Sequence, residues 1–338
     1  YHGAQQDNTA LVAQILEIGF PVIVKPRAGG GGKGMRVATT GDDLDNLLDT
    51  CRREALSAFN DAGLIVERFL ESPRHIEVQV FGDTFGNIVH FYERDCSLQR
   101  RHQKVIEEAP ARELSSRVRE GLIACALTVT KTIGYHGAGT VEFLVKDELF
   151  YFIEMNTRLQ VEHPVTELIT QTDLVEWQLR VAAGQPLPLT QEEIHCRGHA
   201  VQARLYAEDP TRDFLPTGGE GIFAQFPEPC AGIRVDNGVK VGDVIGIDYD
   251  PMIAKIIAHD IDATAAWSKL HTALTQTCLA GPKTNLSFLS NLSDADLSGT
   301  DVFDTGFISR HHSELTAGPD PNNPGIQRIA CWLLYTLG

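Results

Sequence analysis

The sequence is poor in basic residues. Lys and Arg total 29 against 45 Asp and Glu, which gives a formal net charge of −16 at pH 7. Proteins that bind nucleic acids or anionic membranes need a basic surface, so we expect neither partner. No apolar run reaches the roughly 18 residues of a membrane span. The first ten residues, YHGAQQDNTA, lack the basic and apolar regions of a secretory signal peptide.

Closely spaced cysteine pairs are also missing. The seven cysteines are scattered along the chain and none forms a C-x-x-C pair. This usage is typical of reduced thiols, so we expect a cytoplasmic protein, or one of the mitochondrial matrix if the source is eukaryotic. With 43% hydrophobic and 22% charged residues, the composition is that of a globular protein, and 338 residues suit two or three domains.

Helical and strand patterns are both present, which predicts an α+β fold. Apolar spacing predicts helices at 7–18, 42–59, 114–133, 173–183 and 262–277, three of them ended by glycine. Residues 64–94 read as a meander of strands, and GTVEFLV and LFYFIEMN as a hairpin. Near 190–197 the sequence pattern changes to short β segments, and we expect a domain boundary there. Residues 317–325 read as a linker.

A run of glycines follows the strand that ends at Lys25. Glycines let backbone N–H groups approach phosphate oxygens closely. The run is no Walker A loop, because Lys33 is followed by Gly34 rather than Ser or Thr. The spacing Gly29-x-Gly31-x-x-Gly34 matches the dinucleotide fingerprint, but that motif opens a helix and MRVATT reads as a strand. A glycine-rich hairpin that folds over a nucleotide and a plain turn both remain open.

Acidic residues gather on the hairpin near residue 150. Glu154 and Asn156 are two apart on a strand and share one face. A hairpin register centred near Glu148 places Glu142 opposite Glu154. Two carboxylates and an amide oxygen suit a divalent cation such as Mg²⁺, and the alternative is a solvated polar face.

Two further segments carry candidate chemistry. CSLQRRHQK, residues 96–104, is the one basic block, which is either a solvated face or an anion site. Residues 156–164 place Arg158, Gln160, Glu162 and His163 just after the acidic strand. Arg158 could stabilise developing negative charge and Glu162 could act as a general base.

These segments together closely resemble biotin carboxylase, the ATP-grasp component of the biotin-dependent acyl-CoA carboxylases. The matching segments include KPRAGGGGKGM, ERDCSLQRRHQKVIEEAPA, YFIEMNTRLQVEHPVTE, HAVQARLYAEDP and DYDPMIAKII, in the order of the family and over about residues 1–310. The runs RDCSLQRRHQK and EMNTRLQVEHPVTE are the most specific. FDTGFISRH and RLYAEDP are more similar to methylcrotonyl- and propionyl-CoA carboxylase subunits than to the stand-alone type.

The resemblance implies an ATP-grasp fold with a mobile glycine-loop lid and an antiparallel central sheet, followed by a β-rich C-terminal domain. The implied domains are a lid at 1–69, a central subdomain at 70–196, the C-terminal domain at 197–312, and a linker with the start of the following region at 313–338. The implied reaction is carboxylation of biotin by bicarbonate with ATP as the energy source.

The site residues that the resemblance implies fall into three groups. The groups that hold ATP are Lys25, Gly30, Gly31, Gly32, Glu67, Arg68, Phe69, Leu70, His75, Gln99, His102, Glu142 and Glu154. Mg²⁺, or Mn²⁺, would be held by Glu142, Glu154 and Asn156. Bicarbonate and biotin would meet Lys104, Arg158, Gln160, Val161 and Arg204, and the catalytic set is Lys104, Arg158, Arg204 and the base Glu162.

The sequence also departs from the family pattern, because it lacks the family's N-terminal domain and the downstream carrier domain that bears biotin. The partners we expect are a biotinylated carrier domain, a carboxyltransferase β subunit and possible further copies in an oligomer. Two other functions stay open: an inert nucleotide-binding fragment, and another ATP-grasp ligase, which the Gln160-Val161-Glu162-His163 run disfavours.

Overall fold

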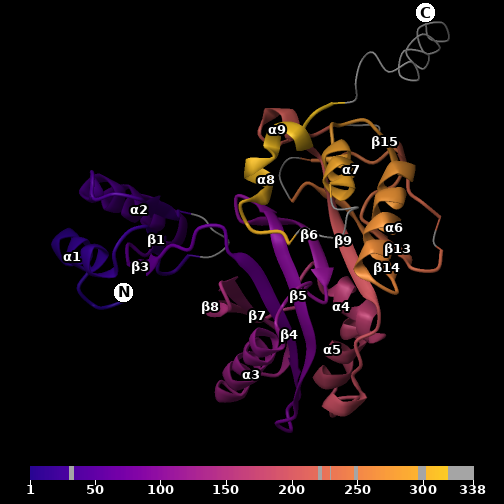
Figure 1. Cartoon of the computed structure of the whole chain (residues 1–338), viewed down its shortest axis with the longest axis horizontal. Coiled ribbons are helices and arrows are strands. Elements are labelled where there is room, and N and C mark those ends of the chain that lie inside the picture. Colours follow the sequence, from indigo (N-terminus) through magenta and orange to yellow (C-terminus); the bar gives the residue numbers. More distant parts are fainter. Residues whose placement is uncertain (30–33, 220–222, 229, 247–249, 296–301, 319–338) are drawn as a thin grey trace, which may run out of the picture.

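The computed structural model describes residues 1–29, 34–219, 223–228, 230–246, 250–295 and 302–318. Within these ranges the chain is α+β, as predicted, with one small and one large antiparallel sheet (Figure 1). No helix in the described ranges is long and apolar enough to cross a membrane.

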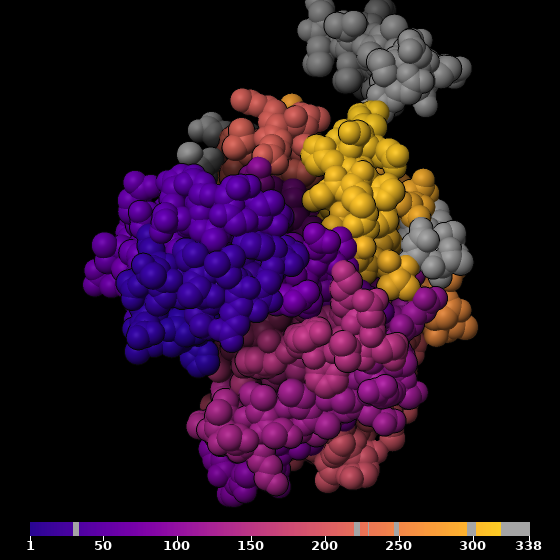
Figure 2. Space-filling model, turned by 60° about the vertical axis from the view of Figure 1, so that its left-hand side comes forward, coloured from indigo at the N-terminus to yellow at the C-terminus, as the bar shows by residue number. Residues whose placement is uncertain are grey.

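The first 68 residues form a small unit of their own. Its elements are α1 (Asn8–Ile18), β1 (Val22–Pro26), β2 (Arg36–Ala38), α2 (Leu44–Phe59) and β3 (Leu64–Arg68), with the sheet order β2-β1-β3. Both helices bury an apolar face against the sheet, around Leu11, Leu48 and Val66. In Figure 2, where this side comes forward, the indigo and violet atoms of the unit form a body beside the rest of the molecule.

The large sheet has eight strands in the order β13-β14-β9-β6-β5-β4-β7-β8, and all neighbours are antiparallel. The strands are β4 (Arg74–Gly82), β5 (Ile88–Arg100), β6 (Gln103–Ala109), β7 (Gly137–Lys146), β8 (Leu149–Asn156), β9 (His199–Tyr206), β13 (Ile233–Asn237) and β14 (Met252–Asp260). Two short pairs lie outside it: β10 (Glu208–Asp209) with β11 (Leu215–Pro216), and β12 (Phe223–Gln225) with β15 (Cys278–Ala280).

One prediction about this region is wrong. Residues 64–94 do not form a single meander, because β3 pairs with β1 in the small sheet while β4 pairs with β5 and β7 in the large one. Residues 69–73, which include Pro73, separate β3 from β4 and carry the chain from one sheet to the other. Local strand patterns do not reveal such a switch, since pairing partners depend on the whole fold.

Helices cover both faces of the large sheet. α3 (Ser116–Thr132) packs on one face, against a cluster that includes Val78, Val141 and Phe143. α4 (His163–Thr170) and α5 (Leu174–Ala182) follow β8, and α4 contacts β5, β6, β9 and β14. The remaining α-helices of the described ranges are α6 (Ala263–Gln276), α7 (Leu286–Asp294), α8 (Phe307–Arg310) and α9 (His312–Leu315).

The helix ends follow the sequence signals closely. Gly19, Gly134 and Gly184, which we expected to stop three helices, all have positive φ just beyond α1, α3 and α5. Asp7, Ser115, Asp173 and Asp262 cap the first turns of their helices with side-chain oxygens. The domain boundaries at 69, 196 and 312 stay predictions.

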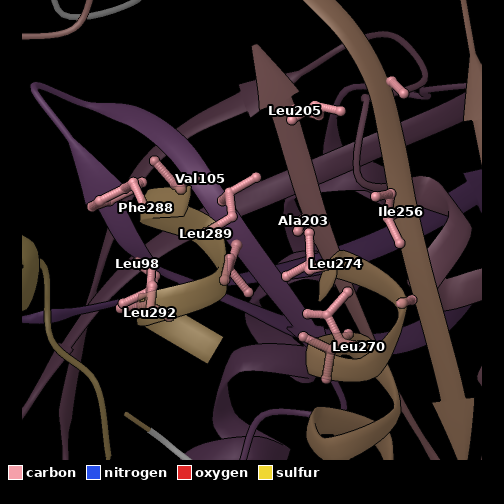
Figure 3. Close-up of a cluster of buried hydrophobic side chains, with 14 of the residues drawn as sticks. Leu98, Val105, Ala203, Leu205, Ile256, Leu270, Leu274, Phe288, Leu289 and Leu292 are labelled. Atoms are coloured by element: carbon pink, nitrogen blue, oxygen red, sulfur yellow. The ribbon is translucent and has the colours of Figure 1, made fainter. Parts of the chain in front are cut away.

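The largest apolar cluster joins α6 and α7 to β5, β6, β9 and β14 (Figure 3). Leu270, on α6, belongs to this cluster and has no exposed surface. We expect Leu270→Ala to lower the free energy of unfolding by about 2–5 kcal/mol, because it removes buried methyl groups and leaves a cavity. Urea unfolding would measure the loss. Leu179→Ala is the control, since Leu179 is 69% exposed, and an equal loss in both variants would contradict the expectation.

Candidate active site

A row of charged residues crosses the large sheet on the face opposite α3. Glu154, Glu142, Glu77 and Arg94 are successive cross-strand partners on β8, β7, β4 and β5. Side chains in such register share one face of a sheet and lie close together. The sheet itself therefore assembles a line of ionisable groups from four strands that are up to 77 residues apart in sequence (Glu77 to Glu154).

The predicted pairing of Glu142 with Glu154 is confirmed. The hairpin turn is Asp147-Glu148, and Lys146 faces Leu149, so a regular ladder would place Glu142 opposite Ile153. A bulge between Glu142 and Phe143 shifts the register by one residue and restores the pairing of the two glutamates. A bulge is a common device for turning a side chain to a particular face.

Glu142 is the most heavily bonded of these acids. Its Oε1 accepts hydrogen bonds from Lys104 Nζ at 2.9 Å, Asn156 Nδ2 at 2.9 Å and Gln160 Nε2 at 3.0 Å, and its Oε2 lies 3.0 Å from His75 Nε2. Burial raises the pKa of Glu142, but His75 and Lys104 outweigh burial and hold it far below its ordinary value. The group is therefore a carboxylate at neutral pH.

Lys104 joins three carboxylates. Its ammonium donates to Glu77 Oε2 at 2.6 Å, Glu142 Oε1 at 2.9 Å and Glu162 Oε1 at 2.6 Å. Burial lowers the pKa of Lys104, but the neighbouring acids, Glu77 first among them, raise it well above its usual range. The basic block thus contributes one ammonium, on a side chain that is 11% exposed, to the acidic row.

Glu162 lies between two cations. It is 2% exposed, it directly precedes α4, and its Oε2 accepts from Arg204 Nη2 at 2.9 Å while Lys104 holds Oε1. Arg204, on β9, also contacts Glu107 Oε1 at 2.5 Å. A base flanked by an ammonium and a guanidinium is suited to take a proton from an anion that the same cations hold.

The loop 157–162 accepts hydrogen bonds from two other strands, β5 and β14. Arg94 Nη2 donates to Gln160 Oε1 at 3.1 Å, and Lys255 Nζ donates to the Val161 carbonyl at 3.1 Å. Arg158 is exposed, and among the described residues its one hydrogen bond goes to the Leu159 carbonyl at 3.3 Å. It is the member of the predicted anion set that does not join the cluster.

The residues predicted to hold nucleotide fall on both sheets. Lys25 on β1 forms an ion pair with Glu67 on β3, and Phe69 N donates to the Pro21 carbonyl at 2.9 Å. Gln99 Nε2 lies 3.3 Å from His75 Nδ1. Arg68 is exposed, Leu70 is half-buried, and Gly30, Gly31 and Gly32 lie outside the described residues, as does Lys33 of the same glycine loop.

His102 lies in the tight turn between β5 and β6, where Arg101 and His102 both have positive φ. Its pKa is lowered by burial and by the charges of Lys25 and His75. Lys25 belongs to the small sheet, and His75 belongs to the large one. The turn is thus within electrostatic range of both predicted nucleotide-holding groups.

The acidic pair fits a hard divalent cation. Glu154 is exposed and has no ion-pair or hydrogen-bond partner among the described side chains, so its oxygens are available beside those of Glu142. Asn156 Nδ2 points its donor at Glu142, so its Oδ1 is the atom left for a ligand. Carboxylate and amide oxygens are the donor set that Mg²⁺ and Mn²⁺ take.

Sequence reasoning missed Glu77, Arg94 and Glu107. All three are fully buried and contact residues that it did identify. A signal for Glu77 was present, because HIEVQV alternates polar His75, Glu77 and Gln79 with apolar residues. That period of two places Glu77 on the face of His75, which had been identified.

Comparison with known proteins gives a consistent assignment. Residues 2–190 match the family described as carbamoyl-phosphate synthase L chain, ATP binding domain, and residues 202–310 match the biotin carboxylase C-terminal domain. The mitochondrial methylcrotonoyl-CoA carboxylase subunit alpha of Rattus norvegicus is 49% identical over 316 residues, which are 93% of this chain and 44% of the relative. Biotin carboxylase 1 of Bacillus subtilis is 42% identical over 87% of this chain and 66% of its own length.

Two solved structures have the same fold. Biotin carboxylase of Campylobacter jejuni, solved as a β,γ-ATP complex, superposes with a TM-score of 0.87 at 42% identity, over 91% of this chain and 69% of that one. The biotin carboxylase domain dimer of Hydrogenobacter thermophilus 2-oxoglutarate carboxylase, solved with MgADP, ADP and bicarbonate, gives 0.88 at 39% identity, over 93% and 69%. The chain spans less than half the length of the rat relative.

Proposed function

The chain belongs to the biotin carboxylase family of ATP-grasp enzymes, and from this premise we propose that it carries out the ATP-dependent carboxylation of biotin by bicarbonate. The observation that carries the proposal is the position of Glu162, a buried carboxylate held between Lys104 and Arg204 beside the acidic pair Glu142 and Glu154. Such an arrangement supplies a base, an anion pocket and a cation site in one place.

The proposed chemistry begins with bicarbonate in the pocket of Lys104, Arg204 and Gln160. Bicarbonate becomes a good nucleophile when it loses its proton, so an oxygen of Glu162 would accept that proton while the cations stabilise the dianion. The dianion oxygen would then attack the γ-phosphorus of ATP, the bond to the ADP oxygen would break, and carboxyphosphate would form. Carboxyphosphate would break down to CO₂ and phosphate, the phosphate would take the ureido N–H proton of biotin, and the resulting enolate would attack CO₂ to give carboxybiotin. Arg158, which is exposed, and Arg204 would stabilise the charges of carboxyphosphate and of the enolate.

Nucleotide would be held by groups from both sheets, with Lys25 and the glycine loop on its phosphates and the 67–70 segment at its base. Glu142, Glu154 and Asn156 would hold Mg²⁺, which when bound neutralises phosphate charge. The chain itself would supply the oxygen ligands of the metal. Lys104 already neutralises part of the negative charge of Glu142 through its bond to Oε1.

We further propose that the longer protein is an acyl-CoA carboxylase of the methylcrotonoyl-CoA type, because six mitochondrial relatives of that name are 46–49% identical to the chain. The propionyl-CoA type is the second candidate. Its partners would be a biotinylated carrier domain and a carboxyltransferase β subunit, in an oligomer. These relatives are named as mitochondrial, which favours the mitochondrial matrix over the cytoplasm as the location of this chain.

The test is ATP cleavage that depends on bicarbonate, with free biotin as acceptor. We expect ADP release that requires bicarbonate and carboxybiotin that forms in proportion. A chain that binds Mg-ATP without cleaving it would be the inert nucleotide-binding fragment. ATP cleavage that is stimulated by an amine or amino acid rather than by bicarbonate would identify another ATP-grasp ligase.

The cation site has its own test. We expect Glu154→Gln to weaken Mg-ATP binding by at least about tenfold, because divalent-cation affinity depends on the charge of the ligands. Calorimetric titration with Mg-ATP would measure it. The control is Glu148→Gln, which changes a carboxylate in the turn of the same hairpin. Equal weakening in both variants would count against the assignment.

A further inference from the structure

Arg94 is a fully buried arginine whose donors are all in use. From β5, its Nε donates to Glu77 Oε1 at 2.6 Å, its Nη1 to Gln79 Oε1 and Thr166 Oγ1, both at 2.8 Å, and its Nη2 to Thr140 Oγ1 at 3.2 Å and Gln160 Oε1 at 3.1 Å. A guanidinium has five N–H donors and no acceptor. Because every donor is taken by the protein, Arg94 has none left for a substrate and can act only through its neighbours.

The contact with Arg94 fixes the orientation of the Gln160 side-chain amide. Since a guanidinium only donates, Gln160 must turn its Oε1 toward Arg94 and therefore its Nε2 toward Glu142, whose Oε1 lies 3.0 Å away. The flipped amide would bring an NH₂ group against the guanidinium and a carbonyl oxygen against the Glu142 carboxylate. Both contacts would be repulsive, so the chemistry of the pair fixes which end of the amide faces the pocket.

The two carboxylate oxygens of Glu77 also have different partners. Arg94 occupies its Oε1, so its Oε2 is the atom that accepts from Lys104 Nζ at 2.6 Å. Arg94 thus fixes a donor on Gln160 and an acceptor on Glu77 at two points of the pocket. The bonds of Arg94 run from β5 to β4, β7, α4 and the 157–162 loop, so the guanidinium is fixed in place. A ligand that turned the Gln160 amide would have to break its bonds to Arg94 and to Glu142.

We propose that Arg94 is a positioning residue that keeps Gln160 a hydrogen-bond donor at the bicarbonate site. The proposal rests on the proposed function for the identity of the anion. An anion oxygen accepts hydrogen bonds, so Gln160 Nε2 can bind it, whereas the carbonyl end of a flipped amide would repel it. A lost hydrogen bond to a charged group weakens binding by about 10- to 100-fold.

The first test needs no catalysis. In protein labelled with ¹⁵N-glutamine, the side-chain amide of Gln160, assigned by its loss in Gln160→Ala, should exchange slowly with solvent. Arg94→Lys keeps the charge beside Glu77 but has too few donors for five acceptors, and we expect exchange at Gln160 to speed up by at least about tenfold. Gln202 is the internal control, since its buried amide donates to Glu107 rather than to Arg94. Unchanged exchange at Gln160, or equal acceleration at Gln202, would overturn the proposal.

The second test separates positioning from bracing of the fold. We expect Arg94→Lys to raise KM for bicarbonate by about tenfold or more and to leave KM for Mg-ATP within about threefold. Gln160→Ala should do the same, and the double variant should be no worse than Gln160→Ala by more than about twofold. Effects that multiply, or equal losses in both KM values, would overturn the proposal. Arg119→Lys, on the opposite face beside Glu93, should leave both values unchanged.

Should Arg94→Lys fail to fold, Gln160→Glu decides the question with Arg94 intact. Arg94 would hold one oxygen of the new carboxylate, and the other would face the pocket as the flipped amide would. We expect a higher KM for bicarbonate than in Gln160→Ala, and an equal or lower one would overturn the proposal. If the wild-type chain cleaves no ATP in response to bicarbonate, the proposed function fails, and the exchange measurement still decides whether Arg94 fixes Gln160.

Discussion

Replacing Glu162 with glutamine is expected to slow bicarbonate-dependent ATP cleavage by about 10²–10⁴-fold. Lys104 and Arg204 hold the two oxygens of Glu162, and the side chain is buried, so the carboxylate has a fixed orientation and is shielded from solvent. Glutamine keeps the shape of the side chain and cannot accept the proton. Binding of Mg-ATP should stay within about threefold of the wild type, because Glu162 is not among the proposed ligands of the nucleotide or the metal.

The measurement is kcat for ATP cleavage beside an independent titration with Mg-ATP. Glu176→Gln is the matched control, since Glu176 is an exposed acid on α5 that pairs with Arg180. Near-normal turnover in Glu162→Gln, or a defect that lies entirely in nucleotide affinity, would mean that another group is the base.

Lys104→Met is expected to cost both activity and stability. The substitution leaves Glu77, Glu142 and Glu162 without the ammonium that joins them, and breaking a buried ion pair from one side costs about 3–5 kcal/mol. The bicarbonate pocket loses a cation at the same time, so bicarbonate-dependent cleavage should fall by at least about 10²-fold.

The stability loss should depend on pH. Burial raises the pKa of Glu77, but Lys104 and Arg94 outweigh it and lower it from 4.5 to about 2. A lowered pKa in the folded state means that ionised Glu77 contributes stability above pH 4.5 and that this contribution is lost as the pH falls toward 2. The deficit of Lys104→Met should therefore be largest at neutral pH and shrink as the solution is acidified below pH 4.5.

Urea unfolding at pH 7 and pH 3.5 would measure this dependence. Lys131→Met, at an exposed position of α3, is the control and should change stability by less than about 0.5 kcal/mol at either pH. A deficit of the same size at both pH values would show that Lys104 contributes packing rather than charge.

Local signals in the sequence predicted the elements better than their partners. Helix ends were placed within a residue or two because the caps and stops are local: Asp173 before α5 and Gly184 after it depend on nothing distant. Sheet order is not local. β9, which follows the domain boundary predicted near 190–197, pairs with β6 and extends the large sheet.

In the candidate site, too, local features were predicted from the sequence and long-range contacts were not. The opposed glutamates of the β7–β8 hairpin were predicted with a turn centred on Glu148, whereas the turn is Asp147-Glu148 and the bulge beside Phe143 supplies the missing residue. Family resemblance supplied Lys104 and Arg204, and the position of Glu162 after the acidic strand had already indicated a base, but neither showed what holds these residues. Arg94 and Glu107 could not be identified from the sequence. Arg94 pairs with Glu77 and Glu107 pairs with Arg204, and such buried ion pairs are recognised only from the geometry of the folded sheet.

The division of the molecule into two sheets has a mechanical consequence. Lys25 stands on the small unit, which the segment 69–73 joins to the large sheet, whereas Lys104, Glu142 and Arg204 stand on strands of one continuous ladder. A rotation of the small unit about that segment would change the distance from Lys25 to the anion pocket and leave the spacing within the pocket unaltered. Such a rotation would widen or narrow the access of a large ligand such as a nucleotide, while the residues that would hold the small anion would keep their spacing.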